Sequence, residues 1–203
     1  MLALLRFHHV VYYLLGGGII ALAFSALLNR DDQTAAQRLA LSAEPPRAVA
    51  IDVFAPARHV GAAQEVRVLG RFAPALSAAL RSGSKVAPLF APGAETTDPP
   101  AAILLERADA PGGFERIATL DQAAEVDGLL VEGGEGFRTS VIEALAAFDI
   151  PQSTPVIAPF ATTREEALTP KPARADAPLI AVFAGCALIL YGIFRSWWTR
   201  RRR

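Results

Sequence analysis

Cysteine is nearly absent from this 203-residue chain, and Cys186 is the only one. An intrachain disulfide is therefore excluded, and any folded domain must be held by its hydrophobic core. An oxidising compartment is allowed by this composition but not required by it. The chain uses alanine and arginine in preference to leucine and lysine, a bias typical of GC-rich bacterial genomes.

Charge is missing from two long apolar segments. Val10–Leu28 and Pro178–Phe194 contain no charged residue over 19 and 17 positions. At a rise of ~1.5 Å per residue, helices of these lengths span most of the ~30 Å hydrocarbon layer of a bilayer. A cleaved signal peptide is the alternative for the first segment and a buried core helix for the second. The missing charge also argues against ion or proton translocation by this chain alone.

The charges that these segments lack are distributed unevenly over the rest of the chain. All 20 acidic residues and 14 of the 20 basic residues lie between the two segments, which gives the middle a net charge of −6. The other basic residues are Arg6, Arg195 and Arg200–Arg203. Basic ends around an acidic middle indicate a membrane protein and not a nucleic-acid-binding one. The positive-inside rule predicts that both termini are cytoplasmic and that residues 31–176 face the periplasm of a bacterial inner membrane.

The end of the second segment predicts a membrane interface. Tryptophans favour the level of the lipid headgroups, and arginines beyond them remain in water. The predicted interface anchors are Arg195, Trp197, Trp198, Arg200 and Arg201. Membrane lipids are therefore expected partners.

Small residues recur at a spacing of four or seven within both segments. They are Gly17, Ala21 and Ser25 in the first, and Ala181, Gly185 and Gly192 in the second. Small residues let helix backbones approach closely in lipid, so these six predict faces that pack against each other or against a partner's helices. Alanine-rich spans also show such spacing by chance, and that alternative stays open.

The region between the segments is expected to be β-rich. Glu65–Phe72 (EVRVLGRF) alternates apolar and charged residues with the period of a strand. Further strands are expected at 48–54, 85–90, 102–107, 114–120, 126–132 and 154–160. Short helices are expected at 73–81 and at 141–149, the second with a capping box of Ser140 and Glu143. Turn residues between these segments predict a small antiparallel sandwich or barrel.

The predicted fold class is thus a membrane protein in which two transmembrane helices flank a mainly-β extracytoplasmic domain with one or two short helices. The expected parts are a cytoplasmic N-terminus (1–9), a first transmembrane helix (10–28), a polar stalk (29–47), a β-rich periplasmic domain (48–160), a linker (161–177), a second transmembrane helix (178–194) and a basic cytoplasmic tail (195–203).

The sequence offers no set of residues for catalysis, for a cofactor or for a metal. His8 and His9 are adjacent and point about 100° apart on a helix, and His59 has no cysteine or histidine near it. The glycine-rich loop 132–140 carries two glutamates, which oppose a phosphate. Ser84-Lys85 is a weak match to a Ser–Lys hydrolase.

Two family resemblances can be stated. The two-anchor topology and the stretch Glu65–Phe72 resemble a family of cytochrome oxidase assembly proteins with an anchor at each end and a β-rich domain outside. That likeness covers about eight residues, and the family's tryptophan-bearing motifs have no counterpart, because both tryptophans are Trp197 and Trp198. The proline-rich entry to the second segment looks like that of polysaccharide chain-length regulators, whose long helical outer domains the prolines and glycines here would break.

The leading hypothesis from the sequence is a non-catalytic accessory or assembly subunit of a respiratory or photosynthetic inner-membrane complex, with the other subunits as partners. An envelope module that binds a lipid, glycan or peptide is the alternative. A membrane-tethered hydrolase that uses Ser84 and Lys85, or scattered carboxylates, is the third hypothesis.

Overall fold

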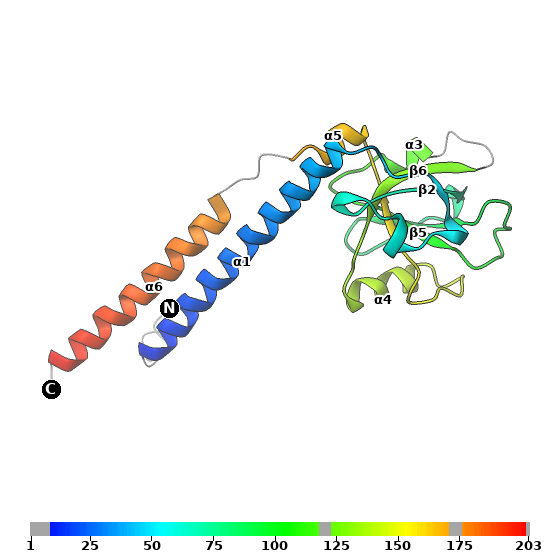
Figure 1. The fold of residues 1–203 in the computed structure, drawn as a ribbon. Coiled ribbons are helices and arrows are strands. Elements are labelled where there is room, and N and C mark those ends of the chain that lie inside the picture. The colour runs from blue at the N-terminus through cyan, green and yellow to red at the C-terminus, as the bar shows by residue number, and fades with distance from the viewer. Residues whose placement is uncertain (1–8, 118–122, 171–175, 202–203) are drawn as a thin grey trace. The chain divides into compact units, whose positions relative to one another are not determined.

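The computed structural model describes residues 9–117, 123–170 and 176–201. The chain divides into a helix unit, Met1–Ala35 with Pro170–Arg203, and a barrel unit, Ala36–Thr169. The long helices are α1 (His9–Ser42) and α6 (Asp176–Arg201) (Figure 1). The shorter helices are α2 (Pro56–His59), α3 (Gly113–Ile117), α4 (Glu135–Ala144) and α5 (Arg164–Leu168), with 3₁₀ turns η2 (Ile51–Val53), η3 (Ala62–Gln64) and η4 (Pro74–Leu76).

Both long helices are long and apolar enough to cross a membrane, over Val10–Ser42 and Pro178–Trp198. Their large apolar side chains are mostly exposed; Leu14 is 72% exposed and Phe183 is 73% exposed. The polar segment 29–42, predicted as part of a stalk, continues α1 without a break.

Within the described residues, seven strands form one sheet in the order β1-β2-β6-β7-β5-β4-β3, with an additional pairing of β2 with β4. The strands are β1 (Val49–Ala50), β2 (Glu65–Phe72), β3 (Ala78–Ala79), β4 (Lys85–Phe90), β5 (Ala102–Glu106), β6 (Ala124–Leu130) and β7 (Val156–Pro159). The β2–β4 pairing joins the sheet to itself, so β2, β6, β7, β5 and β4 close a small barrel. This Greek-key closure is the arrangement of OB-fold barrels.

The barrel is mixed, which corrects the expectation of an antiparallel domain. β1 pairs with β2 in parallel, and β5 pairs with β7 in parallel, through Ile103 with Val156 and Leu104 with Ile157. A parallel pair needs a long crossover connection, and residues 107–155 provide it with α3, β6 and α4 between the two strands. The broader prediction, apolar helices flanking a sheet domain with few helices, is confirmed.

Two apolar clusters hold the barrel unit. The first fills the barrel interior with Val66, Val68, Leu89, Leu104, Val126 and Ile157, all fully buried or nearly so, and Phe114 of α3 packs against them. The second lies on the opposite face of β4 and β5, where α4 covers Val86, Ile103 and Leu105. Strands β4 and β5 are therefore buried on both faces, which explains their continuous apolar sequences.

Gly70 marks the point where β2 turns from β6 to β4. A Cβ atom there would lie 2.8 Å from Leu89 Cγ and 2.9 Å from the Phe90 carbonyl oxygen. The strands can approach this closely only because the side chain is missing. Closure of the barrel therefore depends on glycine at this position.

Several local expectations were wrong. α4 begins at Glu135 with Gly134 as its N-cap, and the predicted capping residue Ser140 lies inside the helix, where its hydroxyl donates to the Gly136 carbonyl. The strand expected at 114–120 overlaps α3, and residues 118–120 lie outside the described part of the chain. The strand expected at 48–54 is limited to β1 and continues as η2, and residues 73–81 form η4 and β3 in place of a helix.

Candidate functional site

Within the helix unit, α1 and α6 pack through glycines. A Cβ atom on Gly16 would lie 2.6 Å from the Gly185 carbonyl oxygen, and one on Gly185 would lie 2.8 Å from the Gly16 carbonyl oxygen. Both glycines are buried, and Gly192 is buried against Tyr12 and Tyr13. The two backbones thus touch at the Gly16–Gly185 contact, as in helix pairs that associate by small residues in lipid.

The small residues predicted on α1 are not the ones that contact α6, so packing of that face against a partner's helices stays a prediction. Gly17, Ala21 and Ser25 are exposed, whereas Gly16 and Ala23 are buried. One residue is a rotation of about 100° on a helix, so the observed face points in a different direction. On α6, Ala181 is half-buried and lines an apolar hollow of about 500 Å³ with Ala23 of α1.

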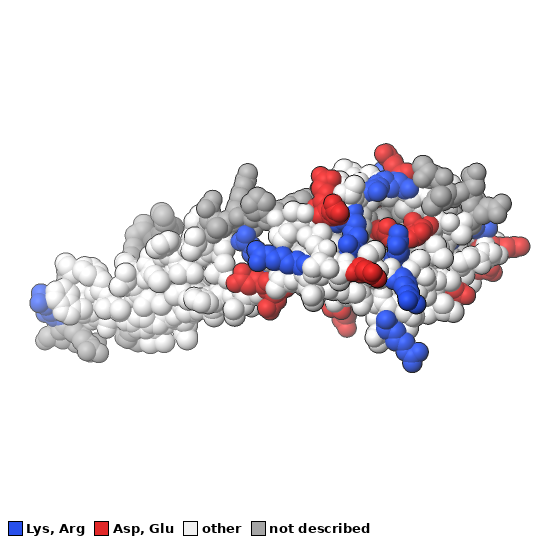
Figure 2. Space-filling model, turned by 45° about the horizontal axis from the view of Figure 1, so that its top comes forward, with Lys and Arg blue, Asp and Glu red and all other residues white. Residues whose placement is uncertain are grey.

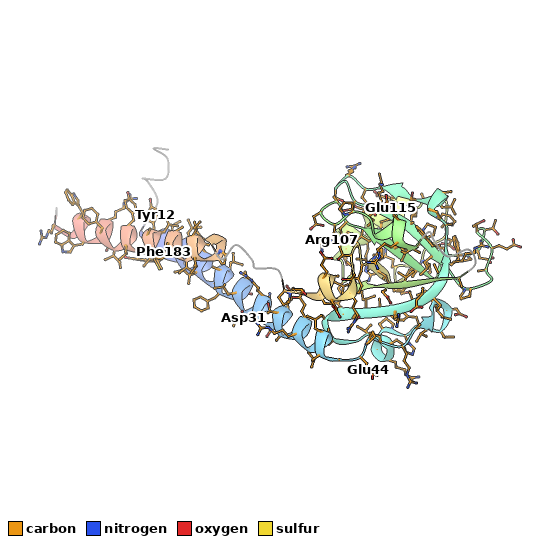
Figure 3. The ribbon with its side chains drawn as sticks, turned by 90° about the horizontal axis from the view of Figure 1, so that it is seen from above. Tyr12, Asp31, Glu44, Arg107, Glu115 and Phe183 are labelled. Atoms are coloured by element: carbon orange, nitrogen blue, oxygen red, sulfur yellow. The ribbon has the colours of Figure 1, made fainter. Side chains whose placement is uncertain are left out.

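Polar and aromatic contacts join the helices at one end of the helix unit. An Arg195 guanidinium nitrogen donates to the Tyr12 hydroxyl at 3.1 Å, and the Tyr12 and Tyr191 rings meet edge to face with centroids 5.2 Å apart. The beginning of α1 and the end of α6 therefore lie side by side. Figure 3 labels Tyr12 and Phe183 on this unit.

The remaining predicted interface anchors lie at the end of α6. Trp197 and Trp198 are each about half exposed, and both pack against Phe194. The Arg201 guanidinium lies 3.6 Å above the Trp197 ring. Arg200 is in the same helix, but its side chain is outside the described side chains. In Figure 2 the helix unit is nearly free of charge between its ends, and the blue and red residues gather on the barrel unit.

In the barrel unit, one arginine fastens the last turn of α1 to the outside of the barrel. Arg164, the first residue of α5, donates to both carboxylate oxygens of Glu65 at 2.5 and 2.9 Å. It also donates to the carbonyl oxygens of Ala40 and Ala43 at 2.6 and 3.4 Å, which satisfies acceptors that a helix end leaves open. We call these contacts the Arg164 clamp.

The clamp is shielded from water. The Glu65 side chain is 5% exposed and that of Arg164 is 22% exposed. Hydrogen bonding to Glu65 is the main reason that the pKa of the Arg164 guanidinium is raised. Beside the ion pair, Ala40, Phe160 and Leu168 form an apolar cluster on the same side of the barrel. The first and last elements of the barrel unit are thereby held together.

A second charged group lies next to the clamp on the outer face of β2 and β6. Arg67 pairs with Glu125 and, at 2.9 Å, with Asp127, its cross-strand neighbour. Burial raises the pKa of Asp127, Arg67 opposes that shift, and Glu125 and Glu65 add to it. The three side chains are each a third or more exposed, so they form a partly solvated charge network.

A groove of about 480 Å³ opens on the other side of the clamp. Its walls are the last turn of α1, the segment that follows it, and α2 with η3; Glu65 lies at its floor. We call it the helix-end groove. Glu44, labelled in Figure 3 just past the end of α1, lies on its rim with Arg47 and Arg58.

The loop beside this groove, between the lining residues Ala62 and Glu65, contains strained backbone. Ala63 and Gln64 have φ values of 56° and 62°, and they are the only non-glycine residues of the described chain with positive φ. A left-handed conformation costs an L-residue about 1–2 kcal/mol. Two such residues in a row persist only where surrounding contacts fix the loop, a pattern that is common at binding sites.

The residues considered for hydrolysis have structural partners. The Ser84 hydroxyl accepts from the Ala108 amide at 3.4 Å, and Lys85 Nζ lies 3.8 Å from a carboxylate oxygen of Glu106. Glu106 is 8% exposed and accepts from the amides of Gly112 and Phe114, so it orders the turn before α3. Among the described residues, no three His, Cys, Asp or Glu side chains come together as a metal site.

Neither the clamp nor the helix-end groove was found from the sequence. Glu65 and Arg164 are 99 residues apart, and Arg164 falls in the segment expected to be a linker. The only local signal was Glu65, a charged residue at the first position of a strand in which apolar and charged residues alternate. Comparison of the chain with protein-family models, curated proteins and solved structures found no match.

Proposed function

We propose that this protein is a non-catalytic accessory or assembly subunit of a bacterial inner-membrane complex. In this proposal α1 and α6 cross the membrane, and the barrel unit lies in the periplasm. The complex is respiratory or photosynthetic, and the protein docks through its helices and its barrel surface.

The observation that carries the proposal is the filled barrel attached to a helix end. The interior positions of β2, β4, β5, β6 and β7 are occupied by fully buried side chains, so the outer surface is the part of the unit available for recognition. The Arg164 clamp holds the last turn of α1 against that same unit. Such an arrangement suits a subunit that recognises partners through the surface of its barrel.

The proposed orientation has two supports. Arg195 and Tyr12 are in contact, so the N-terminal part of α1 and the C-terminal part of α6 lie at one end of the helix pair. Arg201, which follows Trp198 in α6, is at that end too, and the positive-inside rule assigns it to the cytoplasm.

The test combines topology with composition. An alkaline phosphatase inserted after Pro100 is expected to be active, because alkaline phosphatase folds in the periplasm, whereas the same enzyme fused after Arg203 is expected to be inactive. A tagged full-length chain extracted in mild detergent is expected to co-migrate with other membrane subunits. A monodisperse lone species over a range of mild detergents, or the reverse reporter pattern, contradicts the proposal.

A second candidate function is an envelope module that binds a lipid, glycan or peptide. The helix-end groove favours it, because its volume of about 480 Å³ lies within the usual range of ligand sites, ~300–1,000 Å³. A chain that purifies alone yet binds a ligand in this groove would favour this function over the first.

A further inference from the structure

The helix-end groove combines apolar walls with a polar rim. Ala40, Val49 and Val60 contribute to the walls, and the rim carries Arg47 and Arg58. Ligand sites in proteins have this composition, a mainly apolar lining with a few polar groups that fix orientation. The strained residues Ala63 and Gln64 follow directly after the wall residue Ala62, so the loop beside the groove is held in a costly conformation.

The rim supplies donors for an anion. Arg47 and Arg58 are exposed, and within the described residues neither guanidinium group forms a salt bridge or hydrogen bond. His59 accepts the amide proton of Ala55 at its Nδ1 atom, 2.9 Å away. The neutral ring must then carry its own proton on Nε2, which leaves a third donor on a residue that lines the groove.

The acidic residues of the groove limit the charge of a ligand. Glu65 at the floor is already paired with Arg164 through both carboxylate oxygens, so it adds little net charge. Glu44 on the rim is exposed and opposes a polyanion. Two arginines against one unpaired glutamate leave a net charge of about +1 on the rim, which matches a singly charged anion.

We propose that the helix-end groove binds a monoanionic phosphodiester carried on an apolar body. Arg47, Arg58 and His59 Nε2 bind the phosphodiester oxygens, and the apolar walls receive the attached carbon chains. Arginine suits this role because its planar fork of N–H groups matches phosphate oxygens. The inference goes beyond the docking role and names a ligand class for the second candidate function; it holds whether or not the chain has partner subunits.

Histidine NMR tests the proposal directly, because the chain has only three histidines, and the other two, His8 and His9, precede His59 by about 50 residues in the sequence. The full chain, labelled with ¹⁵N-histidine in an uncharged detergent, is titrated with dibutyl phosphate, a soluble monoanionic phosphodiester. We expect a saturable shift of the His59 ring nitrogens and no saturable shift of the other two histidines. A His59 signal that does not respond, or that responds no differently from His8 and His9, overturns the proposal.

Variants separate specific binding from general charge attraction. Arg47→Gln with Arg58→Gln is expected to weaken dibutyl phosphate binding tenfold or more, since two charge-assisted contacts are lost. Arg81→Gln removes one exposed arginine elsewhere on the barrel unit and is expected to leave the affinity unchanged. Equal loss in both variants, or none in the double variant, contradicts the assignment. All three residues are exposed, so none of these changes should unfold the domain.

Two membrane arms identify the source of the phosphodiester. The chain is placed in nanodiscs of phosphatidylcholine alone, whose phosphodiester is balanced by its own choline cation, or with phosphatidylglycerol, whose phosphodiester is the only charge of its headgroup. A His59 shift that appears only with phosphatidylglycerol, and disappears in the double arginine variant, assigns the site to a lipid headgroup. A response to dibutyl phosphate with no response to either nanodisc assigns it to a soluble ligand.

Discussion

The Arg164 clamp gives the most demanding prediction about stability. Arg164→Ala removes two hydrogen bonds to Glu65 and those to the Ala40 and Ala43 carbonyls, and it leaves a carboxylate that is 5% exposed without its cation. Breaking a buried ion pair on one side costs about 3–5 kcal/mol. Because Arg164 is 22% exposed and water can reach the vacated site, we expect the lower end of this range, about 3 kcal/mol.

Controls distinguish the clamp from a simple loss of charge. Arg164→Lys keeps the charge but not the planar fork, and we expect it to cost about 1–2 kcal/mol. The pair Glu65→Leu with Arg164→Met replaces the ion pair by apolar side chains, and it should lie within about 1 kcal/mol of wild type, because neither charge is then left unpaired. Arg81→Ala, at an exposed site, should stay within about 0.5 kcal/mol.

Pulse proteolysis of the full chain in mild detergent across a urea series measures these effects, since cleavage within residues 36–169 reports on the unfolded barrel unit. For an m-value of about 2 kcal/mol/M, the Arg164→Ala midpoint falls by about 1.5 M. Hydrogen exchange in the last turn of α1 should accelerate in parallel, because the Ala40 carbonyl loses its partner. A midpoint within 0.3 M (roughly 0.6 kcal/mol by the same slope) of wild type refutes the reasoning.

Three further predictions concern other parts of the molecule. Gly185→Leu is expected to separate α1 from α6, measured as reduced energy transfer from the tyrosines of α1 to the tryptophans of α6, whereas Gly17→Leu, with no atom within 4 Å of its Cβ position, should leave the transfer unchanged. Gly70→Ala should lower the stability of the barrel unit by about 1–3 kcal/mol through overpacking at the β2–β4 closure. Gly136→Ala, at an open helical site, should raise that stability slightly. Urea-dependent proteolysis measures both changes. Because the pKa of Asp127 is raised in the folded state, this residue stabilises the fold fully at a pH below its ordinary pKa of 3.8. That contribution is lost as the pH rises through the folded-state pKa. The stability of Asp127→Asn relative to wild type should therefore increase as pH rises above 3.8, and a difference that is flat or falls with rising pH contradicts the sign.

The strands predicted from the sequence agree best with the observed strands where the sequence pattern depends only on residues close together in the chain. Glu65–Phe72 alternates because one face of β2 is core and the other is polar, and its observed bounds match the predicted ones. Lys85–Phe90 is recognisable as a buried apolar stretch between turn residues, and it too matches. The residues at 114–117 have similar local propensity, yet Phe114 caps the barrel as part of a helix, because the turn before it is ordered by Glu106.

The sequence by itself determined the two apolar helices, the acidic middle and the β-rich character of the barrel unit, because hydropathy, charge and period are properties of contiguous residues. Only the tertiary structure decided that β5 runs parallel to β7, that Gly16 and not Gly17 faces α6, and that Arg164 meets Glu65. Those outcomes depend on the choice between alternative long-range pairings, whose free energies differ through packing and desolvation that no local pattern records. The helix-end groove belongs to the same class, since its rim and walls come from segments that meet only when the end of α1 is fixed against the barrel.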